Sequence, residues 1–270
     1  MDGAIDVWAQ VPTERFIRQP WLDPLLRWTR QERSAGWTVD GFLADMTDAG
    51  VERALICAWA GPTGMLIDND EVAAIVAQHP SRLSGVAAVD IRQPVAALAE
   101  LRRSVEDLGC VALRIVPWLW DLPPDDRRFY PLYATCVELG IPVCTQIGHT
   151  GPLCPSEPGR PIPYLDRVLL DFPDLVVVGG HVGYPWIDEV LSLVVKYPNF
   201  FVDTSAYAAH RLPAQLVDFM RGPGAGRVMF GTNWPMLTPR RCLDRIEQLH
   251  LDEDGQAAFL AGNAQRVFHL

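Results

Sequence analysis

Residues 175–186 read Leu-Val-Val-Val-Gly-Gly-His-Val-Gly-Tyr-Pro-Trp, and this stretch shows the local pattern from which the fold can be predicted. A short run of apolar residues, from Leu175 to Val178, ends in two glycines, and His181 follows directly. Short continuous apolar runs bounded by glycine, proline or aspartate are typical of strands buried on both faces. The stretch therefore predicts a buried strand with the side chain of His181 at its carboxyl end.

The same pattern recurs along the whole chain. The other predicted strands are residues 4–7, 53–58, 83–89, 111–116, 141–146, 200–203 and 228–230. Amphipathic segments alternate with them, at residues 40–49, 70–78, 94–108, 129–139, 164–171, 187–197, 212–220 and 240–249. Such βα units predict a single α/β domain over residues 1–270, a closed parallel (β/α)8 TIM barrel. An open doubly wound sheet is the alternative, but no GxGxxG or P-loop motif follows the first strand.

The first connection, residues 8–39, is longer than the others and contains Trp21, Trp28 and Trp37. We expect it to form a helical insertion after the first strand, lying over the barrel mouth. A proline-rich segment, residues 152–163, predicts a second ordered loop at the same end.

The composition excludes several classes of partner. Lys and Arg total 23 against 33 Asp and Glu, a net charge of −10. Nucleic acid and anionic membrane surfaces repel such a chain, so we expect neither as a partner. No apolar run is long enough to span a bilayer, and the N-terminus lacks the basic region of a signal peptide. The six cysteines form no CxxC pair, which predicts reduced thiols and a cytoplasmic location.

Functional residues of such barrels follow the carboxyl ends of the strands. The catalytic candidates there are His181, His149 and Asp203, since imidazole and carboxylate groups transfer protons. The candidate substrate-binding residues at the same end are Trp8, Gln10, Arg114, Trp118, Gln146, Tyr184, Tyr207 and Asn233.

Several candidates also have a structural explanation. His149 could pin a loop, and Asp203 could cap a turn through bonds to Thr204 or Ser205. A charge inside a strand is costly without a partner, so Arg114 faces either a substrate carboxylate or a structural ion pair. The two tyrosines either donate to a developing oxyanion or lie at loop edges.

Tryptophans are the most unusual feature of the predicted strand ends. They follow the strands as Trp8, Trp59, Trp118, Trp120, Trp186 and Trp234. If they line the cavity rather than fill the core, the substrate is flat and apolar. The amides of Gln10, Gln146 and Asn233 would then bind its oxygen substituents.

Three motifs together resemble the amidohydrolase-related family (amidohydrolase 2). Gly-Gly-His181-Val-Gly-Tyr-Pro-Trp is similar to the family's sixth-strand signature, and Phe-Gly-Thr-Asn233-Trp-Pro to its eighth-strand signature. Residues 262–268 are similar to its closing helix. The family includes metal-dependent decarboxylases of aromatic acids, hydratases and lactonases, so the resemblance implies an enzyme. Because its members often form dimers, the resemblance makes a homodimer one expected assembly.

The chain departs from the family at the metal ligands. The first strand of the family ends in His-x-His, where this chain has Trp8 and Gln10, and the eighth-strand Asp is Asn233. Depending on register, the fifth-strand His corresponds to Gln146 or to His149. Tryptophan does not coordinate metals, and neutral amide oxygens are poor ligands for Zn²⁺. We therefore expect no catalytic metal and no cofactor, in a subgroup that lacks the usual ligands.

Three functions remain open at this point. The sequence favours a metal-independent hydrolase acting on an ester, lactone or amide-like bond of a small cyclic or aromatic metabolite. His181, with His149 or Asp203, would activate water. The alternative is a lyase that decarboxylates or dehydrates an aromatic or dienoic acid, with Arg114 and the amides holding the substrate's oxygens. The third is a non-catalytic pseudoenzyme that binds a small molecule.

Overall fold

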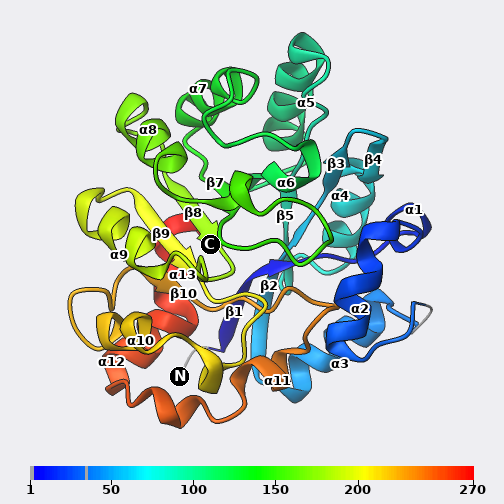
Figure 1. Cartoon of the computed structure of the whole chain (residues 1–270). Coiled ribbons are helices and arrows are strands. Elements are labelled where there is room, and N and C mark those ends of the chain that lie inside the picture. The colour runs from blue at the N-terminus through cyan, green and yellow to red at the C-terminus, as the bar shows by residue number, and fades with distance from the viewer. Residues whose placement is uncertain (1–2, 34–35) are drawn as a thin grey trace.

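The computed structural model describes residues 3–33 and 36–270, and a parallel sheet of eight strands lies at its centre (Figure 1). The strands lie side by side in the sheet in the order in which they occur along the chain. They are β1 (Ala4–Ala9), β2 (Val51–Cys57), β5 (Leu83–Ala87), β6 (Ala112–Ile115), β7 (Val143–Gln146), β8 (Val177–Gly180), β9 (Phe200–Asp203) and β10 (Val228–Met229). Each apolar run predicted as a strand overlaps one of them.

The eighth strand and the segment after it close the sheet onto the first strand. The backbone N–H of Val7 donates to the carbonyl of Phe230 at 3.0 Å, and that of Asn233 donates to the carbonyl of Trp8 at 2.7 Å. The sheet is therefore a barrel. The predicted fold class, a TIM barrel in a single α/β domain, is confirmed.

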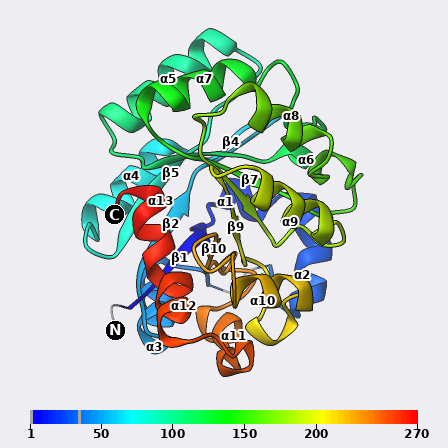
Figure 2. The same cartoon turned by 90° about the vertical axis from the view of Figure 1, so that its left-hand side faces the viewer.

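Helices surround the barrel, as the turned view shows (Figure 2). They are α3 (Val39–Asp48), α4 (Asn69–Gln78), α5 (Pro94–Glu106), α7 (Tyr130–Leu139), α8 (Tyr164–Asp171), α9 (Ile187–Lys196), α10 (Ala214–Met220) and α13 (Asn263–Phe268). Local signals fix several ends: Thr38 caps α3 by accepting from the N–H of Gly41, and Gly140 ends α7 with a φ of 66°. In the described part of the chain, no helix is long and apolar enough to cross a membrane.

The expectation of one helix over residues 240–249 is wrong. The chain forms α11 (Pro239–Leu243) and then a 3₁₀ helix, η4 (Ile246–Leu249). Between them, Asp244 has a ψ of 124° and Arg245 has a left-handed φ of 58°, and neither conformation continues an α-helix.

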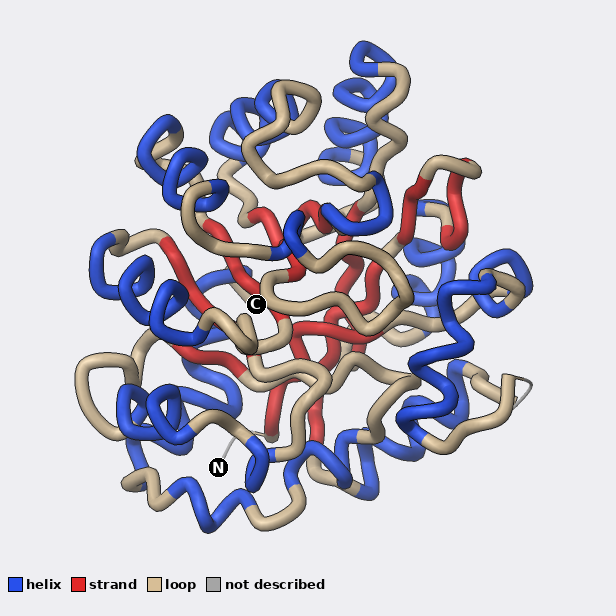
Figure 3. The backbone as a smooth tube through the Cα atoms, in the orientation of Figure 1, coloured by secondary structure: helices blue, strands red, loops and turns tan. Residues whose placement is uncertain are grey.

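The predicted helical insertion after the first strand is confirmed. It consists of α1 (Glu14–Ile17), η1 (Pro20–Leu22) and α2 (Asp23–Thr29), which lie outside the ring of strands (Figure 3). The remaining elements are short: the antiparallel hairpin β3 (Trp59–Gly61) and β4 (Gly64–Ile67), and the helices α6 (Pro117–Trp120), η2 (Glu157–Gly159), η3 (Ala209–Arg211), α12 (Glu253–Ala257) and the π-helix η5 (Ala258–Gly262).

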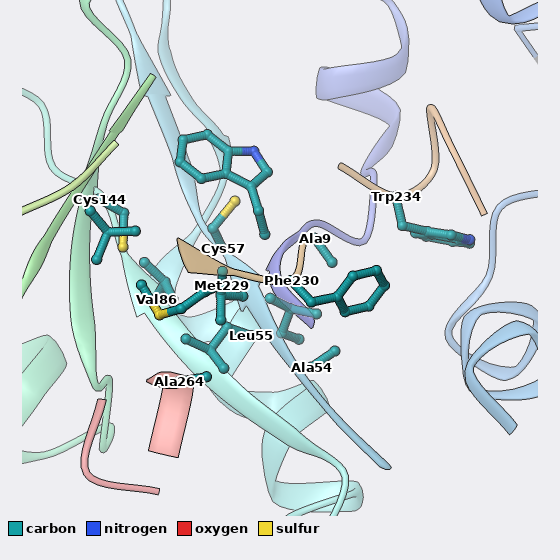
Figure 4. Packing of buried hydrophobic residues seen from close by; sticks show 14 of the residues in the cluster. Ala9, Ala54, Leu55, Cys57, Val86, Cys144, Met229, Phe230, Trp234 and Ala264 are labelled. Atoms are coloured by element: carbon teal, nitrogen blue, oxygen red, sulfur yellow. The ribbon is translucent and has the colours of Figure 1, made fainter. Parts of the chain in front are cut away.

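Apolar side chains fill the inside of the barrel. Figure 4 shows Leu55, Cys57, Val86, Cys144 and Met229 gathered there from strands that are far apart in the sequence. A second apolar cluster includes residues of β6–β9 and of the helices α5 and α7–α9. This packed interior makes the carboxyl end of the strands a firm floor for a site.

Candidate functional site

A cavity of about 690 Å³ opens at the carboxyl ends of the strands. Many of the residues predicted for the site line it: Gln10, Trp118, Gln146, His149, His181, Tyr207 and Asn233. The helical insertion contributes Trp21 and Trp28 to the same wall. The cavity therefore brings residues from most of the chain into one place.

Aromatic rings form one wall of the cavity. The rings of Trp21 and Trp59 stack with centroids 5.7 Å apart and an interplanar angle of 17°. Trp118 meets Trp21 edge to face at 5.1 Å, and its indole N–H donates to Oε1 of Gln146 at 2.6 Å. Rings that pack on one another in this way give a rigid, flat, apolar surface suited to an aromatic ligand.

The strand-end tryptophans divide between the two alternatives, lining the cavity and packing in the core. Trp59 and Trp118 line the cavity. The ring of Trp234 packs on Phe42 at 4.5 Å, and its N–H donates to Asp45, so it faces the outer helix α3. Trp21 and Trp28 of the helical insertion complete the aromatic lining of the cavity.

Trp8 lies beneath the cavity, in the barrel interior. Its side chain is buried, and the guanidinium carbon of Arg114 lies 3.7 Å from the centroid of its ring. The Trp8 ring also neighbours His181, with ring centroids 4.9 Å apart and an interplanar angle of 58°. Trp8 and Arg114 are therefore not among the lining residues but form a buried cation–π pair below them.

Arg114 is a buried cation with few partners. Its side chain is almost fully buried, and Nη1 donates to the sulfur of Cys57. In the described part of the chain, Nε and Nη2 have no hydrogen-bond partner. Its positive charge lowers the pKa of both His181 and Asp203, in each case as a smaller effect than burial. Arg114 thus supplies a fixed positive charge to the floor of the site.

The backbone around His181 adopts an unusual conformation. His181 has a φ of 71° and Val182 a φ of 53°, both in the left-handed region that non-glycine residues rarely adopt. The N–H of Val182 donates to the carbonyl of Asp203 at 3.1 Å, which ties this turn to β9. Strained backbone of this kind clusters at functional sites.

His181, Ser205 and Asp203 are joined by hydrogen bonds. Nδ1 of His181 lies 2.6 Å from Oγ of Ser205, and the Ser205 hydroxyl also donates to Oδ1 of Asp203. Burial raises the pKa of Asp203 to about 6. Burial, with the charge of Arg114 as the second cause, lowers the pKa of His181 to about 3, so its imidazole is neutral at pH 7.

Sequence reasoning did not identify Ser205 as a site residue. It named Ser205 only as a turn partner of Asp203, and that bond is present, from the Ser205 N–H to Oδ1 of Asp203 at 2.9 Å. The contact with His181 depends on the turn after β8, which residue types do not encode. The sequence signal that could have identified Ser205 as a site residue was its hydroxyl group, two residues after Asp203 at the end of a strand.

The tyrosine and histidine candidates differ in position. Tyr207 lines the cavity, and burial raises its pKa to about 12, so it is a hydrogen-bond donor at neutral pH. Tyr184 is 51% exposed and is not among the lining residues; its ring and that of His149 lie edge to face. His149 lines the cavity, and burial lowers its pKa. Asp203 is fully buried below the cavity.

The amides on the floor bind one another. Nε2 of Gln10 donates to Oδ1 of Asn233 at 3.2 Å and to the carbonyl of Trp234. Gln146 is the last residue of β7; its Oε1 accepts from Trp118 and its Nε2 donates to the carbonyl of His149 at 3.5 Å, which leaves one amide N–H for another oxygen. These side chains present neutral polar groups to the cavity.

The residues at the family's ligand positions do not fit a catalytic metal. Within residues 3–33 and 36–270, no group of three or more His, Cys, Asp or Glu side chains is placed to hold an ion. Trp8 holds the first position and stacks on a guanidinium, and Gln10 is bonded to Asn233. A neutral amide pair beside a buried cation is a poor setting for a dication.

Metal analysis provides a direct check. Protein purified without nickel affinity resin or chelator is expected to carry well below one zinc, manganese or iron per chain by plasma mass spectrometry. Dialysis against EDTA should leave its melting temperature unchanged, because metal removal destabilises only proteins whose fold uses the metal. One metal ion per chain would contradict the conclusion that Trp8, Gln10 and Asn233 do not fit a catalytic metal.

The mouth of the cavity is more basic than the protein as a whole. The chain has a net charge of −10, yet Arg211, Arg241 and Arg245 all line the cavity, against one described acidic lining residue, Asp244. Asp244 and Arg245 form an ion pair at 3.2 Å. The local charge therefore favours entry of an anion, in spite of the acidic surface elsewhere.

Comparison with known proteins identifies the family. Residues 5–270 match the family model described as Amidohydrolase. The chain is 26% identical to gamma-resorcylate decarboxylase of Polaromonas sp. over 251 residues, 75% of each chain, and 25% identical to 2-keto-4-carboxy-3-hexenedioate hydratase of Sphingobium sp. over 278 residues, 83% of this chain and 78% of that one. An uncharacterised TIM-barrel protein of Bordetella bronchiseptica superposes with a TM-score of 0.87 at 28% identity, covering 98% of both chains. Because the family model spans nearly the whole chain, this protein belongs to the amidohydrolase family.

Proposed function

We propose that this protein is a lyase that removes CO2 from a small aromatic acid with a hydroxyl group beside its carboxylate. The observation that carries the proposal is the cavity itself, in which a flat tryptophan wall, a basic mouth and the neutral imidazole of His181 meet. An aromatic ring suits the wall, and a carboxylate suits the arginines.

The comparisons support a lyase over a hydrolase. The sequence alone favoured hydrolysis and kept decarboxylation or dehydration as the alternative. The curated relatives reported above are a decarboxylase and a hydratase, so they favour that alternative. A hydroxylated aromatic acid also agrees with the flat, oxygen-substituted substrate expected from the tryptophans and amides.

The chemistry requires one proton to move twice. Nε2 of neutral His181 takes the proton of the substrate hydroxyl, and the resulting phenolate raises the electron density at the carbon that bears the carboxylate. His181 returns the proton to that carbon, the carbon–carbon bond breaks, and its electron pair restores the aromatic ring as CO2 leaves. The phenolate then takes one proton from solvent, so acid plus H⁺ gives phenol plus CO2.

Neutral donors hold the substrate's oxygens during these steps. The remaining amide N–H of Gln146 is directed by the bonds of its side chain to Trp118 and to the carbonyl of His149, and Tyr207 and Asn233 line the same cavity. Preorganised donors of this type stabilise charge that develops on oxygen. The buried charge of Arg114 adds to this field from below.

Carboxyl-labelled substrates test the proposal. We expect 2,6-dihydroxybenzoate or salicylate with ¹³C in the carboxyl group to release labelled CO2 and the corresponding phenol, followed by ¹³C NMR. Tight binding of these acids without release of label would instead indicate a binding protein. Opening of an aryl lactone such as dihydrocoumarin, with the labelled acids left intact, would restore the hydrolase hypothesis.

A further inference from the structure

We propose that Ser205 is a positioning residue that links Asp203 to His181, so that the three side chains form a proton relay and Ser205 determines which nitrogen of His181 carries the proton. The inference rests on the proposed function only for the step that involves substrate. The arrangement of protons in the free protein can be tested without any substrate.

The three groups are in contact, and the two below His181 are sealed from solvent. Ser205 and Asp203 are both fully buried. Oγ of Ser205 lies 2.6 Å from Nδ1 of His181 and donates to Oδ1 of Asp203, and this oxygen also accepts from the N–H of Ser205 at 2.9 Å and from that of His181 at 3.4 Å. Water therefore has no place between the three side chains.

Counting hydrogens fixes the direction of the relay. A serine hydroxyl carries one hydrogen, and when Asp203 is ionised that hydrogen bonds to its carboxylate. Oγ of Ser205 must then accept from Nδ1, so His181 carries its proton there and keeps a lone pair on Nε2. When Asp203 is protonated, the bonds can reverse, and Nε2 then carries the proton. The state of Asp203 thus decides whether His181 acts as a base or as an acid.

The surroundings place this switch near neutral pH. Burial raises the pKa of Asp203 to about 6 and lowers that of His181 to about 3, so Asp203 takes up a proton first as the pH falls. The neighbouring titratable or charged groups that act on the relay are Arg114 on β6, Asp6 on β1, Cys144 on β7 and His149 after β7. Arg114 is the only described cation among them, and it favours ionised Asp203.

The relay gives a balanced transfer. The substrate hydroxyl gives its proton to Nε2, the proton on Nδ1 moves to Oγ of Ser205, and the hydroxyl proton of Ser205 moves to Oδ1 of Asp203. The negative charge passes from Asp203 to the substrate oxygen, and each bond that breaks is replaced by one that forms. His181 ends neutral, which its buried position and the nearby Arg114 both favour.

Backbone geometry on both sides holds the relay in place. His181 has a φ of 71°, and Ala206, which follows Ser205, has a φ of 67°. The N–H of Ala206 donates to the carbonyl of Thr232 at 3.2 Å. Left-handed conformations of non-glycine residues persist where the surrounding structure imposes them, and here they flank both ends of the contact between His181 and Ser205.

Nitrogen NMR of uniformly ¹⁵N-labelled protein tests the inference. In the wild type at pH 7.5 we expect His181 to show a protonated Nδ1 and a bare Nε2. Lowering the pH through about 6 should move the proton to Nε2 while the ring stays neutral. A wild-type ring with its proton on Nε2 at pH 7.5, or one that becomes an imidazolium near pH 6, would overturn the proposal.

Ser205→Ala and a matched control separate the relay from general effects of losing a buried hydroxyl. The alanine variant should shift the His181 proton toward Nε2 at pH 7.5. Ser104→Ala is the control, because Ser104 is also fully buried and donates to a carboxylate, that of Glu100 at 3.3 Å. The control should leave the His181 signals unchanged. An unchanged His181 in folded Ser205→Ala would contradict the relay.

Kinetics extend the test once turnover is measured. Ser205→Ala should lower kcat by about 10²-fold with little change in KM, at the lower end of general acid–base effects. Wild-type kcat/KM should rise with pH through about 6, and this rise should be absent from the pH profile of Ser205→Ala. Absence of decarboxylation with the expected NMR result would reject the proposed function alone, whereas decarboxylation with an unaffected Ser205→Ala would reject the relay alone.

Discussion

Replacing His181 by asparagine is expected to lower kcat/KM for decarboxylation by about 10²–10⁴-fold, the range over which positioned general acids and bases act. Asparagine keeps a polar side chain but has no lone pair on nitrogen that can take the substrate's proton. The neutral state of His181, whose pKa burial lowers to about 3, makes it a base at pH 7. Steady-state kinetics on a labelled hydroxybenzoate measure the loss.

His210→Asn provides the matched control for this variant. His210 also lines the cavity, but it lies at the mouth and bonds to Asp244 rather than to the buried relay. We expect the control to stay within a few-fold of the wild type. Equal losses in the two variants would argue against a specific role of His181, and full activity of His181→Asn would remove it from the mechanism.

Arg114→Leu is expected to lower the free energy of unfolding by about 2 kcal/mol, the order of a desolvated cation–π contact. The guanidinium stacks on Trp8 and its charge lowers the pKa of buried Asp203, so its loss removes the ring contact and raises that pKa further. Urea unfolding monitored by tryptophan fluorescence measures the effect, with the slope of the transition compared between variants.

A double variant distinguishes charge from packing in this result. Arg114→Leu combined with Asp203→Asn removes both charges, so its loss of stability should be smaller than the sum of the two single losses. Arg114→Lys keeps the charge but loses the planar group that stacks on Trp8. Strict additivity in the double variant would show that the charges of Arg114 and Asp203 do not interact.

The barrel could be predicted because strands buried on both faces leave a strong trace in sequence. The run ending in Gly179 and Gly180 predicted β8, and the matching runs predicted the other strands of the barrel. The hairpin of β3 and β4 has strands of three and four residues, too short for a detectable alternation. The break at Arg245 was missed because a left-handed arginine has no residue-type signal.

Only those site residues could be predicted that lie at the carboxyl ends of the strands. His181, Gln146 and Asn233 line the cavity because each follows or ends a strand at the same edge of the barrel. Side-chain direction within a loop does not follow from sequence, so the sequence left open whether Trp234 lines the cavity or fills the core, and it packs on Phe42. The bond from Ser205 to His181 joins two loops, and the sequence carries no pattern for it.

Decarboxylation in D2O by chelator-treated wild-type protein tests the central claim most directly. A carboxyl-labelled 2,6-dihydroxybenzoate should give labelled CO2 and resorcinol with one deuterium on the ring carbon that lost the carboxylate, because His181 delivers a solvent-derived proton there. The rate should be the same before and after chelation, since the floor of Gln10, Asn233 and Trp8 fits no metal. Restoration of activity only by added metal, or recovery of the acid with its label intact, would contradict the account.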